Sequence, residues 1–138
     1  MSEKSMRKTV ITLLKQLDAR PVENRVGIGM PDVNYVEGWI ELKELKEWPV
    51  QNGTVHVPHY TQDQRLWALR RRRSLGKCWL LLKVKQEWLL MQGDVAAEVL
   101  GRVPRSQLIY RSWRYWPKGI DRLSLISALY SKQQMAYE

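Results

Sequence analysis

The apolar and polar positions follow two periods along the chain, one typical of helices and one typical of strands. Apolar spacings of three and four predict amphipathic helices, whereas alternation and short apolar runs predict strands. The pattern predicts helices at about 3–17, 61–74, 94–100 and 120–134, and strands or extended segments at 32–36, 39–45, 78–84, 88–91 and 107–116. This order, in which helices separate groups of strands, predicts a mixed α/β domain.

Local signals mark the ends of two of these helices. Thr61 and Gln64 match a capping box, in which each side chain accepts a hydrogen bond from the backbone N–H of the other residue. Gly76 is the expected end of that helix. Asp94 is the expected N-cap of the following helix, and Gly101 is the residue expected to stop it.

Composition limits the class of protein. The chain has 138 residues and a mass of 16.4 kDa, which suits one domain with its own core. Its longest apolar run is Cys78–Leu82, so no membrane-spanning helix is expected, and the polar N-terminus carries no apolar signal core. A single cysteine excludes an internal disulfide framework and a multi-cysteine zinc site. We therefore expect a cytoplasmic protein without membrane contact.

Basic charge is concentrated in the second part of the chain. Residues 1–60 contain eight basic and eight acidic residues. Residues 61–138 contain fifteen basic and six acidic residues, which accounts for the whole net charge of +9. This asymmetry favours a polyanionic partner, of which nucleic acid is the commonest. A solvated basic face without a partner is the alternative.

The predicted hairpin at 32–45 separates apolar from polar residues. With Glu37-Gly38 as a two-residue turn, Val36 faces Trp39 and Asp32 faces Lys43. Opposed residues share a face of the sheet, as do alternate residues of one strand. One face then carries the apolar side chains Val33, Tyr35, Ile40 and Leu42, and the other carries Asp32, Asn34, Glu41 and Lys43, with Val36 and Trp39 at its turn end.

The polar face of this hairpin carries two carboxylates and a lysine. Carboxylates such as those of Asp32 and Glu41 can hold one divalent cation through their oxygen atoms. A neighbouring ammonium such as that of Lys43 can stabilise a developing oxyanion or help to activate a water molecule. The alignment depends on the turn, since a turn of three residues would change which side chains share a face.

The spacing of these residues resembles a known nuclease signature. Pro31-Asp32, followed after eight residues by Glu41-Leu42-Lys43, is similar to the PD-(D/E)xK motif. With Gly29 before it, Trp48-Pro49 after it and the Thr-x-x-Gln segment at Thr61–Gln64, the chain resembles small VRR-NUC and Holliday-junction-resolvase-like nucleases, phage-encoded members in particular. The resemblance covers about residues 3–92 and leaves a basic, aromatic extension at about 93–138 without a match.

The resemblance implies a fold and an activity. The fold would be a single PD-(D/E)xK restriction-endonuclease-like domain over residues 1–138, with a central mixed sheet flanked by helices. The activity would be that of a Mg²⁺- or Mn²⁺-dependent endodeoxyribonuclease, which hydrolyses phosphodiesters of duplex or branched DNA such as Holliday junctions. A phage-encoded member would act in the cytoplasm of the host.

The resemblance also implies a role for each matching residue. Asp32, Glu41 and the backbone carbonyl of Leu42 would hold the cation. Lys43 would position or activate the attacking water, and Gln64 would support the site from its helix. Acidic residues upstream of the Pro-Asp dipeptide complete the set of candidates, namely Glu23 or, in its place, Glu3.

Several basic residues are candidates for contact with DNA phosphates. The run 70–73 consists of four arginines, whose mutual repulsion phosphates would offset. The segment 110–118 interleaves aromatics with cations, which suits base stacking and phosphate contact, although core packing explains the aromatics equally well. The candidate DNA contacts are Arg65, Arg70, Arg72, Arg73, Arg111, Arg114 and Lys118.

Each candidate has an alternative reading. Asp32 could cap a turn, residues 41–47 could form a solvated helix, and Gln64 could serve only its capping box. His56 and His59 are poor zinc ligands because Pro58 opposes a helix between them and no third ligand is evident. Cys78 fits a buried small apolar residue. A non-catalytic DNA-binding or accessory protein, or an RNA-binding protein, would also suit the charge.

A homodimer is expected if the substrate is a four-way junction. Symmetric cutting needs two active sites, and one chain carries one set of Asp32, Glu41 and Lys43. The apolar residues of the helix beginning at Ile120 could form the two-fold contact. The alternative is that this helix covers the sheet of its own chain.

Overall fold

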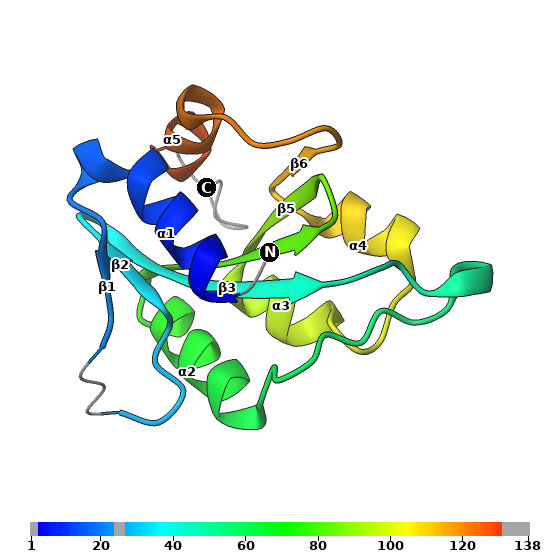
Figure 1. Ribbon diagram of the computed structural model, residues 1–138. Helices are drawn as coiled ribbons and strands as arrows, with labels where there is room; N and C mark the ends of the chain where they lie inside the picture. The colour runs from blue at the N-terminus through cyan, green and yellow to red at the C-terminus, as the bar shows by residue number, and fades with distance from the viewer. Residues whose placement is uncertain (1–2, 24–26, 131–138) are drawn as a thin grey trace.

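The computed structural model describes residues 3–23 and 27–130, which build one six-stranded mixed sheet (Figure 1). The strands lie in the order β1-β2-β3-β4-β5-β6. Their bounds are Arg20–Pro21 (β1), Val33–Tyr35 (β2), Gly38–Leu45 (β3), Lys77–Val84 (β4), Glu87–Gln92 (β5) and Arg114–Trp116 (β6). Only the central pair β3 and β4 is parallel, and the other neighbours are antiparallel. The predicted mixed α/β architecture is confirmed.

Helices cover both faces of this sheet (Figure 1). Their bounds are Glu3–Leu13 (α1), Gln62–Arg73 (α2), Gly93–Val99 (α3), Arg105–Arg111 (α4) and Arg122–Tyr130 (α5), with short 3-10 helices at Lys15–Leu17 and Val50–Asn52. Helices α1 and α5 lie on one face, and α2, α3 and α4 lie on the other. Among the described residues, no helix has the length and apolar character needed to cross a membrane.

Strict alternation along the strands divides the core into two clusters. The first packs α1 and α5 against one sheet face and contains Met6, Val10, Leu14, Ile40, Leu42, Trp79, Leu81, Leu90 and Leu125. The second lies under α3 and α4 and contains Leu80, Leu82, Leu89, Met91, Ala96, Val99 and Leu108. Neighbouring residues of β4 therefore belong to different clusters, as expected of a strand buried on both faces.

The β2–β3 hairpin has a different register from the predicted one. Val33 pairs with Ile40 and Tyr35 pairs with Gly38, so the turn consists of Val36 and Glu37 rather than Glu37 and Gly38. The pairing is displaced by two residues, and because the side-chain period of a strand is two, the faces do not change. The predicted apolar face is buried in the first cluster, through Val33, Tyr35, Ile40 and Leu42.

Two expectations about the extent of helices and strands were wrong. The first helix ends at Leu13, and a 3-10 helix replaces its predicted last turn. Residues 105–111 form the helix α4, so the predicted strand at 107–116 is confined to Arg114–Trp116. A helix of seven residues presents few apolar positions, of which Leu108 is buried, and its periodicity is therefore hard to recognise.

The cap of α3 also differs from the prediction. Its N-cap is Gln92, and Asp94 lies inside the first turn, where its carboxylate pairs with Arg72. The capping box of α2 is confirmed, because Thr61 Oγ1 accepts from the N–H of Gln64 and Gln64 Oε1 accepts from the N–H of Thr61. The prediction of a helix to residue 134 is tested only as far as Tyr130, since residues 131–138 lie outside the described part of the chain.

Gly29 allows the segment before β2 to approach the start of α2. Its φ is +83°, and a Cβ atom there would lie 2.4 Å from the carbonyl oxygen of Asp63. A side chain would therefore collide with the backbone of the helix rather than with a flexible group. The absence of a side chain at Gly29 therefore lets this segment lie against the first turn of α2.

We expect Gly29→Ala to destabilise the protein more than Gly119→Ala. Both glycines have positive φ, but a Cβ at Gly119 would meet no atom within 4 Å. Gly119→Ala should therefore cost only the backbone strain of about 1–2 kcal/mol, while Gly29→Ala should cost a further 1–3 kcal/mol, roughly, because packed backbone must move. Denaturant unfolding of both variants measures the difference, and equal losses would contradict the proposed close packing.

Candidate functional site

Two charged side chains are buried on one face of β3. Glu41 is 6% exposed and Lys43 is 3% exposed, and they are the buried charged residues of the described chain. Their neighbours on the parallel strand β4 are Leu80 and Leu82, which belong to the apolar core. Burial of a charge is costly unless it is paired and hydrogen-bonded. A fold that retains both charges here invites a functional explanation.

The lysine is held by two oxygen atoms. Its Nζ lies 3.9 Å from Oε1 of Glu41 and donates a hydrogen bond of 2.9 Å to the backbone carbonyl of His59. His59 has a φ of +63°, an uncommon conformation for a residue with a side chain. The loop before α2 is thus shaped so that its carbonyl reaches the ammonium of Lys43. His59 contributes through its backbone, a role that its side chain does not signal in the sequence.

Asp32 joins the same site from the residue before β2. Its Oδ2 accepts a hydrogen bond of 2.9 Å from the N–H of Leu42, the residue between Glu41 and Lys43. Asp32 is half-buried, and its own backbone carbonyl accepts from the N–H of Val22. The structure therefore brings the carboxylate of Asp32 to the backbone of the segment Glu41-Leu42-Lys43.

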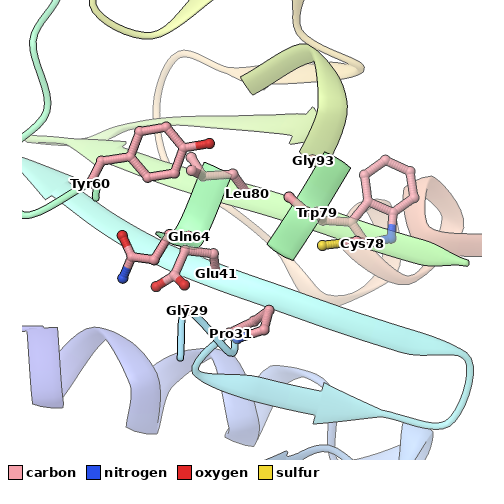
Figure 2. Close-up of a pocket in the computed structure, with 10 residues that line it drawn as sticks. Gly29, Pro31, Glu41, Tyr60, Gln64, Cys78, Trp79, Leu80 and Gly93 are labelled. Atoms are coloured by element: carbon pink, nitrogen blue, oxygen red, sulfur yellow. The ribbon is translucent and has the colours of Figure 1, made fainter. Parts of the chain in front are cut away.

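A small pocket opens beside Glu41 (Figure 2). Its volume of about 10 Å³ is close to the space that one water molecule needs. It is lined by Gly29, Pro31, Glu41, Tyr60, Gln64, Ala68, Cys78, Trp79, Leu80 and Gly93. Helix α2 therefore places Gln64 at the same pocket as Glu41, while the amide oxygen of Gln64 also serves the capping box.

Tyr60 is a pocket residue that the sequence analysis did not select. Its hydroxyl is buried and makes no hydrogen bond within the described part of the chain. Burial raises the pKa of Tyr60 well above its usual range, so the hydroxyl keeps its proton. The sequence signal that could have indicated Tyr60 is its position directly before Thr61, in the loop that leads into α2.

Cys78 lies in the wall of the same pocket as a neutral thiol. Burial, followed by the nearby charge of Glu41, raises its pKa to about 12. A thiol with this pKa is protonated at physiological pH and is a poor nucleophile. This agrees with the interpretation of Cys78 as a small apolar residue of a buried strand.

Of the acidic candidates whose side chains are described, Glu41 lines the pocket, whereas Asp32 and Glu23 do not. Glu23 is exposed and is not among the residues that line it. The side chain of Glu3 lies outside the described residues. Within 3–23 and 27–130, no group of three or more His, Cys, Asp or Glu side chains could hold a metal ion. The predicted ligand set has only two carboxylates and a backbone carbonyl, all of them hard oxygen donors that suit Mg²⁺ or Mn²⁺.

Two of the candidate DNA-binding arginines point into the protein. Arg65 donates to the carbonyl oxygens of Ala97 and Leu100 at the end of α3. Arg72 donates to Asp94 and to the side-chain oxygen of Gln92, and its side chain is only 10% exposed. The seven-residue spacing of Arg65 and Arg72 therefore marks the stripe by which α2 packs on α3.

The other basic candidates lie at the surface. Arg70, Arg73 and Lys118 are exposed. Arg111 is also exposed and donates a hydrogen bond of 2.9 Å to the carboxylate of Glu98. The guanidinium of exposed Arg114 lies 4.8 Å from the ring centre of Trp113. Arg71, which was not selected, lies over the rings of Trp39 and Trp67.

No model of a protein family matches the chain, and no curated protein shows significant similarity to it. The resemblance to PD-(D/E)xK nucleases therefore rests on the motif itself and on the positions of its residues.

We expect Arg72→Met to destabilise the fold and Arg73→Met to leave it nearly unchanged. The first substitution removes charged hydrogen bonds that join α2 to α3, which should cost about 1–3 kcal/mol. The second alters an exposed neighbour and should stay within roughly 0.5 kcal/mol. Thermal and denaturant unfolding of the two variants provide the measurement. Similar stability of both would show that Arg72 is not a structural residue.

Proposed function

We propose that the protein is a metal-dependent endodeoxyribonuclease with a PD-(D/E)xK site. The observation that carries this proposal is that Glu41 and Lys43 are buried on one face of β3, while the carboxylate of Asp32 accepts a hydrogen bond from the N–H of Leu42 between them. Structural needs alone are better met by apolar side chains, since a buried ion pair often stabilises less than a hydrophobic replacement. A reaction that needs carboxylates and an ammonium at one place explains why the charges are kept.

The donor set fits a hard divalent cation. Asp32 and Glu41 supply carboxylate oxygens, and the carbonyl of Leu42 lies between Glu41 and Lys43 in the chain. When bound, Mg²⁺ or Mn²⁺ would supply positive charge for the phosphate and would lower the pKa of water. The chain's own residues would hold the cation, orient the phosphodiester and keep the reacting atoms beside the ammonium of Lys43.

Lys43 is fixed in direction, which suits a positioning role. Its contacts with Glu41 and with the carbonyl of His59 restrict the four-carbon side chain. A restricted ammonium can donate to a phosphate oxygen or to the attacking water without first losing conformational freedom. Gln64 would support Glu41 from α2, the helix that carries the exposed residues Arg70 and Arg73 toward its other end.

Branched DNA is the substrate class that we infer, with a homodimer for symmetric cutting of junctions. Helix α5 buries Leu125, Ala128 and Leu129 in the core of its own chain. Its exposed apolar residues are Leu123 and Tyr130, which leaves a smaller surface for a two-fold contact than the sequence suggested. A dimer through this helix would therefore need additional residues from the C-terminal part.

A non-catalytic DNA-binding protein is the second candidate. The closeness of Glu41 and Lys43 favours it, because the pair could serve only to fix the loop before α2 through the carbonyl of His59. Such a protein would bind DNA through its exposed arginines and would cut none. The two candidates therefore differ in cleavage and not in binding.

We expect Asp32→Asn and Glu41→Gln each to lower the rate of DNA cleavage by at least about a hundredfold. Each substitution removes a carboxylate that would hold the cation, and so removes several kcal/mol, roughly, of transition-state stabilisation. Both substitutions keep size and remove one charge, so DNA binding should persist or become tighter as repulsion of phosphate falls. The assay offers linear duplex, flap, splayed-arm and four-way-junction DNA with Mg²⁺, Mn²⁺ or EDTA.

Glu47→Gln is the matched control for these variants. Glu47 lies two residues after the end of β3 and its carboxylate is 74% exposed, so its loss changes the charge without touching the pocket. It should cut at the rate of the unchanged protein. Cleavage by Asp32→Asn at that same rate would refute the site. Absence of metal-dependent cutting of every DNA by the unchanged protein would favour the non-catalytic alternative.

A further inference from the structure

Helix α2 carries a second surface feature beyond the pocket at Glu41. A hollow of about 220 Å³ is lined by Trp67, Arg70, Arg71 and Ser74, and we call it the Trp67 hollow. Arg70 and Arg71 are exposed, and Trp67 is half-buried. The hollow thus combines an aromatic ring with two cations at the surface of the molecule.

The walls of the Trp67 hollow are ordered by ring contacts. Trp39 of β3 meets Trp67 edge to face, with ring centres 5.3 Å apart and planes inclined by 71°. The guanidinium of Arg71 lies 4.5 Å from the ring centre of Trp67 and 5.6 Å from that of Trp39. Because these contacts restrict the ring of Trp67 in the free protein, less conformational entropy is lost when a ligand binds against it.

The Trp67 hollow adjoins the proposed nuclease site. Trp39 lies two residues before Glu41 and on the same face of β3. Trp67 follows Gln64 by three residues, which is about one turn of α2. Two strand residues span roughly 6.6 Å and one helical turn about 5.4 Å, so the aromatic pair is displaced in one direction from the Glu41–Gln64 pocket.

We propose that the Trp67 hollow binds an unpaired nucleotide of DNA next to the phosphodiester that is cut. The base would stack against Trp67 and the guanidinium of Arg71, and the exposed Arg70 would contact a phosphate. Aromatic rings and arginine planes accept any base by stacking, and neighbouring cations follow the backbone. This inference rests on the proposed nuclease function and names the substrate feature that the site selects.

Selection of unpaired DNA follows from the chemistry of stacking. In a continuous duplex the faces of the bases are covered by their neighbours, and exposing one costs a few kcal/mol. At a flap, a splayed arm or a junction the bases beside the branch are more easily unstacked. A hollow that rewards an exposed base would therefore favour branched and single-stranded DNA over continuous duplex.

The arrangement also explains why consecutive arginines are tolerated on α2. Arg72 is neutralised by Asp94 inside the protein, but Arg70, Arg71 and Arg73 are exposed at the end of the helix. Like charges on adjacent turns destabilise a helix by a few tenths of a kcal/mol per pair. A cationic surface beside two tryptophans is complementary to a nucleotide, which carries both a flat base and an anionic phosphate.

The test measures binding in EDTA, where no cutting can occur. Fluorescence anisotropy follows labelled single-stranded, splayed-arm and continuous duplex oligonucleotides. Trp67→Leu should weaken binding of the first two by about 5- to 100-fold, the range that corresponds to one lost base–aromatic stack. Duplex binding should change by less than about twofold, and Trp67→Phe should restore much of the loss because a ring remains.

Two further variants keep the result interpretable. Val50→Ala trims an apolar side chain that is 83% exposed in the 3-10 helix Val50–Asn52, outside α2, and should leave all three affinities unchanged. Arg71→Ala alters an exposed residue and provides the test if Trp67→Leu fails to fold; it should weaken single-strand binding about two- to fivefold. Thermal unfolding confirms that each variant is folded.

The outcomes separate this inference from the nuclease proposal. Unchanged single-strand binding by folded Trp67→Leu, or an equal loss for duplex DNA or with Val50→Ala, would overturn the Trp67 hollow as a base site. Metal-dependent cleavage would stand in that case. Selective loss of single-strand binding supports the hollow even if no DNA is cut, because the measurement needs no catalysis.

Discussion

Burial of two opposite charges on β3 constrains the structure around them. Glu41 and Lys43 occupy a sheet face whose next strand presents leucines, so their environment has little water. Such charges persist only where fixed polar partners surround them. The carbonyl of His59 fixes the ammonium, and the loop that provides it leads directly into the capping box of α2. The charged pair is therefore joined to the loop from which this helix begins.

Helix α2 connects the features that we assign to function. Gly29 allows its first turn to lie against the segment before Asp32, and Gln64 then reaches the pocket beside Glu41. Further along, Arg72 joins the helix to α3, while Trp67 and Arg71, which contact the ring of Trp39, line the hollow. A binding site needs a rigid support. On α2 the inward arginines join the helix to its neighbours, and the outward arginines remain exposed for the proposed contact with DNA.

Much of the arrangement of the candidate site could be predicted from the sequence, because displacing the strand pairing by two residues leaves every side chain on the same face of the sheet. Val33 pairs with Ile40 rather than with Leu42, yet Glu41 and Lys43 still share the face predicted for them. The directions of the arginines could not be predicted in this way. Arg65 turns inward because the carbonyls of Ala97 and Leu100 meet it there, and only tertiary packing places those carbonyls. Tyr60 lies in a loop, where no periodic pattern is expected. Helix α4 has only seven residues, which are too few to show a clear helical period.

Binding of Mn²⁺ by the protein alone tests the central claim most directly, because it probes the carboxylates without DNA or turnover. Calorimetric titration of the unchanged protein should show one saturable site per chain. Asp32→Asn keeps an oxygen acceptor for the N–H of Leu42 but loses the charge, so it should bind Mn²⁺ more weakly by over about 100-fold, beyond the usual effect of an outer-shell change. Equal binding by both proteins, or no saturable binding by the unchanged one, would contradict a metal site at Asp32 and Glu41.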